Sequence, residues 1–273
     1  MLKLRKLAAL TVVTFPLAGC GTVLDMFGPE PNPELVVFAQ QADADAESLV
    51  DDPAARELRA TQAKELYRDI TRLCGVDESG QAPSSCEVDT PNELDGGTDT
   101  PRASAHVMDM VVEKLHVLPD DSVDLVTAQA IDFAALAEVA LPDGTTIADE
   151  TDATAAREML SQEYAAQYGL GLASAYADDA LQERLDVLED AHQQRIDVLV
   201  DSLDEAPPAA TGYEFAGMEP PTTTEAAAEF VEKLEGELVI SWRTMPADAK
   251  SAEWLDISFA LAAHAQYSQN TTR

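Results

Sequence analysis

The chain has 273 residues, of which 46% are hydrophobic and 5% aromatic, and its formal net charge at pH 7 is −34. A surface this negative repels nucleic acid, so we expect no nucleic-acid partner. Abundant alanine with few aromatic residues favours closely packed helices over sheets, and the length allows one large or two small domains.

The first twenty residues have the pattern of an export signal. Lys3, Arg5 and Lys6 precede an apolar run, Leu7–Phe15, which is followed by Leu17-Ala18-Gly19-Cys20. This end resembles a bacterial lipobox, in which small residues precede the cysteine that receives the lipid. We therefore expect a signal peptide over residues 1–19 and a lipid on Cys20 that anchors the chain to the cell membrane, on its extracytoplasmic face. The alternatives are a plain cleaved signal with a coincidental cysteine and a retained transmembrane helix, for which the apolar run is short.

Residues 20–31 are rich in glycine and proline and predict a lipidated tether, and residues 32–145 predict an N-terminal helical domain. Helix caps, prolines and apolar spacing indicate four helices in this domain, at about 33–51, 53–73, 103–117 and 122–140. Cys74 and Cys86 flank a Gly-, Pro- and Ser-rich stretch. An even pair of cysteines in an oxidising compartment predicts a disulfide between them.

Residues 150–270 predict a C-terminal four-helix bundle. Two helices, at about 152–176 and 178–203, are followed by a proline-bearing linker and by two helices that flank Met245-Pro246. Two hairpins joined by a crossover loop are the layout of a ferritin-like bundle. The first half repeats this layout, so the expected fold is all-α, with a ferritin-like bundle preceded by a second helical bundle or by a helical extension.

Polar residues interrupt the apolar rows of the C-terminal helices. Carboxylate-bridged di-iron or di-manganese centres take one Glu from each of two helices and Glu-x-x-His from each of the other two. The candidate metal ligands are Glu163, Glu189, His192, Glu235 and His264. Leu261 stands where the second Glu-x-x-His would need its Glu. The alternative is a set of core salt bridges in which Glu163 or Glu235 pairs with His192.

The expected turns set the depth of these residues in the bundle. Glu163 and Glu189 should lie level, because each is about thirteen residues from the first turn. Glu235 and His264 should differ in depth by roughly one helical turn.

Three segments carry a resemblance to a known family. They are Ser161–Gly171, Ala191–Leu199 and Phe230–Glu237, to which Tyr213 and Trp242 are added. Together they resemble the ferritin-like domain of unknown function found in actinobacterial proteins, many of them exported. The resemblance covers about Asp152 to Gln269 and implies the fold but no activity, and Tyr164 and Gln194 stand where that family has a His and an Arg.

The sequence lacks the patterns of common enzymes. We find no Gly-x-Ser-x-Gly, no phosphate-binding glycine loop and no His near Cys74 or Cys86, so we name no catalytic residue. The expected function is a non-catalytic envelope or binding role, towards a protein or a small ligand, for a lipid-anchored protein with a degenerate ferritin-like bundle. The alternative is a metalloprotein that binds or oxidises iron or manganese through the five candidate ligands.

Overall fold

The computed structural model describes residues 28–76, 80–88 and 94–272. These residues form helices and connecting loops, without a strand, so the all-α prediction is confirmed. None of the described helices is both long and apolar enough to cross a membrane. The predicted signal peptide, Cys20 and most of the predicted tether lie outside the described residues.

The first half contains two helical hairpins. Asn32, Asp52 and Asp99 act as N-caps, because each side chain accepts a hydrogen bond from the backbone amide three residues later, and a proline stands in the first turn of each of these helices. The helices are α1 (Pro33–Ser48), α2 (Pro53–Cys74), α3 (Thr100–Lys114) and α4 (Asp120–Ala134), with short 3₁₀ turns at Ser84–Cys86 and Leu115–Val117. Helix α4 ends at Ala134, six residues before the expected end.

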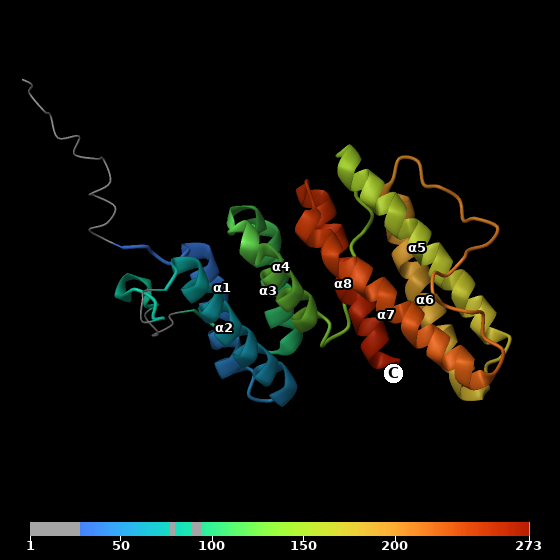
Figure 1. Cartoon of the computed structure of the whole chain (residues 1–273), viewed down its shortest axis with the longest axis horizontal. Coiled ribbons are helices and arrows are strands. Elements are labelled where there is room, and N and C mark those ends of the chain that lie inside the picture. The colour runs from blue at the N-terminus through green and yellow to red at the C-terminus, as the bar shows by residue number, and fades with distance from the viewer. Residues whose placement is uncertain (1–27, 77–79, 89–93, 273) are drawn as a thin grey trace, which may run out of the picture.

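The second half is a four-helix bundle of α5 (Glu150–Ser174), α6 (Asp179–Ser202), α7 (Thr224–Asp248) and α8 (Ala252–Thr271). Residues 203–223 return along the length of the bundle, so that α6 and α7 run parallel (Figure 1). The start of α7 lies beside the end of α5, where the Thr224 hydroxyl donates to the Tyr176 carbonyl. Two hairpins joined by one long crossover are the predicted layout.

The boundary between the last two helices differs from the prediction. Helix α7 continues through Pro246 to Asp248, and the turn lies at residues 249–251. The carboxylate of Asp152 fixes this turn, because it accepts hydrogen bonds from the amides of Lys250 and Ser251 and from the Ser251 hydroxyl. Glu235 and His264 then stand at nearly equal distances along the chain from the turn. The expected offset of one helical turn between them was therefore wrong.

The two halves are packed against each other in layers. Helices α3 and α4 lie between the α1–α2 hairpin and the α7–α8 hairpin (Figure 1). Arg243 of α7 forms an ion pair with Asp132 of α4 across this junction. The first half therefore extends the layering of the bundle, and α4 packs on both α7 and α8.

Two features stabilise the first half. Cys74 and Cys86 form the predicted disulfide, which ties the loop after α2 to the end of that helix. Asp45 of α1 and Arg59 of α2 form a buried ion pair, with Asp45 Oδ2 2.8 Å from the guanidinium. Arg59 also donates to Gln62, and its guanidinium lies over the ring of Phe133. The buried charges of this half are thus paired and hydrogen-bonded.

Candidate functional site

Six polar or amphipathic side chains meet at the centre of the C-terminal bundle. We call them the buried ion cluster: Glu163 from α5, His192 and Arg195 from α6, Glu235 and Trp242 from α7, and His264 from α8. His264 is 7% exposed and the others at most 1%. The periodicity of the helices explains this placement, because each residue continues an inward row of apolar side chains, such as Leu185, Leu188 and Leu199 on α6.

The carboxylate of Glu163 is the central acceptor of the cluster. Its Oε1 accepts hydrogen bonds from Arg195 Nε at 2.7 Å and from Trp242 Nε1 at 2.6 Å. Its Oε2 lies 2.6 Å from His192 Nδ1. Burial alone would raise the pKa of Glu163, but the charges of Arg195 and His192 and the hydrogen bonds from them lower it to about 2. Glu163 is therefore ionised at neutral pH.

His192 bridges the two buried carboxylates. Its Nδ1 faces Glu163, and its Nε2 lies 2.9 Å from Glu235 Oε1. The imidazolium form would donate to both carboxylates from its two ring nitrogens. In that form the 2.8 Å approach of Arg195 Nη2 to His192 Nδ1 is a contact between two N–H groups and not a hydrogen bond. Burial and the charge of Arg195 would lower the pKa of His192, but Glu235 and Glu163 raise it above its ordinary value.

Arg195 connects His264, on helix α8, to the rest of the buried ion cluster. Its Nη1 lies 3.2 Å from His264 Nδ1, and its Nη2 lies 2.8 Å from His192 Nδ1. Burial lowers the pKa of His264 to about 4, and the charge of Arg195 contributes to this shift. His264 is thus a neutral acceptor. With Glu163, Glu235 and His192 all charged, two carboxylates balance one guanidinium and one imidazolium, and the cluster carries no net charge.

The structure brings some of the sequence-predicted residues together and not others. Glu163, His192 and Glu235 are in direct contact, and His264 reaches them through Arg195. Glu189 is exposed on α6, so its expected place at the centre of the bundle was wrong. The inward position on that turn belongs to Leu188, and one residue further along an α-helix is rotated by about 100°.

Arg195 is the cluster residue that the sequence reasoning missed. It stands three residues after His192 and four before Leu199, which is the spacing of an inward-facing row. That spacing could have identified Arg195 as an inward-facing residue. Arginine is rarely buried unless it is paired, and its partner Glu163 is distant in sequence.

The cluster does not fit the two-metal centre that was the alternative interpretation of these residues in the sequence. The guanidinium of Arg195 contacts Glu163, His192 and His264, which are three of the candidate ligands. A metal ion among these side chains would meet a buried cation whose N–H groups already occupy Glu163 Oε1 and His264 Nδ1. Within the described part of the chain, no group of three or more His, Cys, Asp or Glu side chains is arranged to hold a metal.

The ion cluster predicts a large difference between two glutamates of the bundle. Glu163→Gln removes the charge that compensates Arg195 and His192, and we expect the free energy of unfolding to fall by about 3 to 5 kcal/mol. Glu189→Gln is the matched control on the exposed face, and its effect should stay within about 0.5 kcal/mol. Urea denaturation followed by circular dichroism measures both. Equal effects of the two substitutions would contradict the geometry of the cluster.

His264 predicts a defined pH dependence of stability. Because its pKa is about 4 in the folded chain and 6.5 ordinarily, only the unfolded chain takes up this proton as the pH falls from 6.5 to 4. The contribution of His264 to the free energy of unfolding is therefore fully present above pH 6.5. It decreases by about 3 kcal/mol in total as the pH falls from 6.5 to 4. His264→Asn should lose that part of the pH slope, and the exposed-residue control His106→Asn should keep it. Denaturation curves between pH 4 and 7 test this, and an unchanged slope in His264→Asn would refute the assignment.

Comparison with known families places a match on the same part of the chain. Residues 155–266 match a family described as "Domain of unknown function (DUF4439)". This range contains the whole buried ion cluster and none of α1–α4. No curated protein and no solved structure matches the chain. The bundle is thus similar to a domain of unknown function, over nearly the same residues as the resemblance expected at about Asp152 to Gln269.

Proposed function

We propose that the protein is lipid-anchored on the extracytoplasmic face of the cell membrane, and that its ferritin-like bundle is a metal-free, non-catalytic body with an envelope or binding role. The position of Arg195 is the observation that supports the metal-free part of this proposal. In a carboxylate-bridged centre, metal cations balance the buried glutamates. Here the guanidinium of Arg195 and the ring of His192 supply that charge from within the chain.

The burial of the cluster also argues against catalysis. Its least buried side chain, His264, is 7% exposed, and a substrate would have to open the bundle to reach Glu163. The contacts of the cluster occupy both oxygens of Glu163 and one oxygen of Glu235. Such an arrangement stabilises one packing of the four helices, and its bases lie out of reach of a substrate.

The second candidate function is iron or manganese binding. Its support is the convergence of Glu163, His192 and Glu235, which are the residue types that such centres use. For this function the guanidinium of Arg195 would have to leave its present position.

The lipid anchor rests on the first twenty residues. Loss of residues 1–19 would remove Lys3, Arg5 and Lys6 and make the remaining chain more acidic than the full sequence. Anionic lipid headgroups repel such a surface. In this proposal the lipid on Cys20 therefore holds the protein at the membrane against the charge of its own helices.

Metal content separates the two candidate functions. A chain that begins at Gly21 is incubated with ferrous iron or manganese at pH 7 and desalted, and bound metal is measured by elemental analysis. We expect no stoichiometric metal on the natural sequence or on the Glu189→Gln control. Two equivalents that are retained by the natural sequence and lost in Glu235→Gln would overturn the proposal in favour of a working metal centre.

Membrane attachment should depend on Cys20. In a bacterium that processes lipoproteins, we expect the natural chain to partition into the detergent phase and to incorporate a labelled fatty acid. Cys20→Ala should do neither, because no thiol remains to be acylated. An unlabelled natural chain in the aqueous phase would show instead that the signal is a plain cleaved one.

A further inference from the structure

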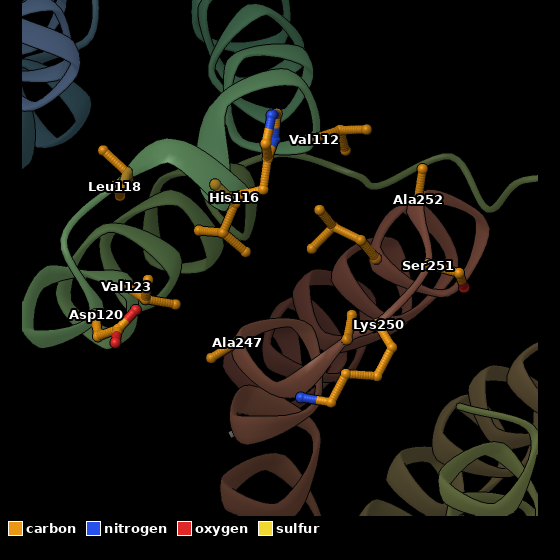
Figure 2. Close-up of a pocket in the computed structure, with 12 residues that line it drawn as sticks. Val112, His116, Leu118, Asp120, Val123, Ala247, Lys250, Ser251 and Ala252 are labelled. Carbon is orange, nitrogen blue, oxygen red and sulfur yellow. The ribbon is translucent and has the colours of Figure 1, made fainter. Parts of the chain in front are cut away.

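A cavity of about 380 Å³ lies where the two halves of the molecule meet. It is bounded by the α3–α4 connection on one side and by the α7–α8 turn on the other (Figure 2). Its floor is apolar and is formed mainly by Leu115, Leu118 and Leu255, each less than 10% exposed, with Val112 and Val123 beside them. Its volume falls within the range of small-ligand sites.

The rim of the cavity carries one basic and one acidic side chain. Figure 2 shows Lys250 on one side of the cavity and Asp120 on the opposite side. His116 lines it as well, and Asp120 is the one carboxylate among the lining residues. In the described part of the chain, Lys250 forms no ion pair. Its ammonium group is therefore available to a ligand.

The backbone on this side of the cavity is held in place by hydrogen bonds. Helix α4 begins at Asp120 and α8 begins at Ala252, and both residues line the cavity. The amides at the start of α8 are already hydrogen-bonded, because the Trp254 amide donates to the Ser251 hydroxyl and those of Lys250 and Ser251 donate to Asp152. The turn that bears Lys250 is also fixed in place, because the buried carboxylate of Asp152 accepts hydrogen bonds from the amides of Lys250 and Ser251. The site is therefore largely pre-formed.

We propose that this cavity binds an amphipathic anion, namely an aliphatic chain with one carboxylate. The chain would lie on the leucine floor, and the carboxylate would pair with Lys250 at the rim. A neutral amphiphile would leave Lys250 without a partner, and a cationic one would place its head group beside the ammonium. The cavity shares no residue with the buried ion cluster, so this inference goes beyond the proposed function and does not depend on the metal content of the bundle.

Calorimetric titration with octanoate tests the proposal on the chain that begins at Gly21. We expect saturable binding of one octanoate per chain, and at least tenfold weaker binding of octanol and of octylamine. Lys250→Met should weaken octanoate binding at least tenfold. Lys64→Met, which alters an exposed lysine of α2 outside the cavity, should leave it unchanged.

A second variant locates the ligand. Val123→Trp fills the space over the leucine floor and should abolish octanoate binding while circular dichroism shows the helices intact. Tighter binding of octyl phosphate than of octanoate, sensitive to the same two substitutions, would overturn the carboxylate as the head group in favour of a phosphate. Unsaturable binding, or octanoate binding that both Lys250→Met and Val123→Trp leave unchanged, would overturn the proposal.

Discussion

The buried carboxylate of Glu163 is the constraint on which the C-terminal bundle depends. A carboxylate removed from water needs both a counter-charge and hydrogen-bond donors, and an uncompensated one would be strongly destabilising. Glu163 on α5 obtains them from two helices: His192 and Arg195 on α6, and Trp242 on α7. Arg195 extends the same network to His264 on α8. The relative positions of all four helices are thereby tied to one side chain, and the cluster remains neutral as a whole.

Other parts of the molecule also join helices through buried, hydrogen-bonded polar side chains, at places where no functional site is proposed. Asp45 and Arg59 form a buried pair between α1 and α2, and Gln62 extends it to the Gln129 carbonyl of α4. Asp152 at the start of α5 accepts the amides of the α7–α8 turn. These interactions join helices that are distant in sequence and fix their register. Their recurrence in the first half supports a structural interpretation of the ion cluster in the second half.

Much of this arrangement could be predicted from local sequence signals. Asn32, Asp52 and the following prolines marked helix starts, and the interrupted apolar rows identified Glu163, His192 and Glu235 as residues that meet in the core. The wrong or missing predictions concern residues whose positions depend on contacts between helices. Glu189 lies one position from the inward row, which periodicity alone does not resolve. Helix α7 continues through Pro246, and the turn beyond it is fixed by Asp152. Arg195 was missed because its burial depends on a partner on another helix.

The central claim is that the cluster carries its own positive charge, on Arg195 and on a protonated His192. The most direct test is nitrogen NMR of the histidine rings at pH 6.5, where an ordinary histidine is half protonated. The account predicts that both ring nitrogens of His192 carry protons, while His264 in the same molecule has one unprotonated nitrogen. A neutral His192 at that pH would contradict the account, because the two glutamates would then have only Arg195 to balance them and the bundle would have room for an external cation.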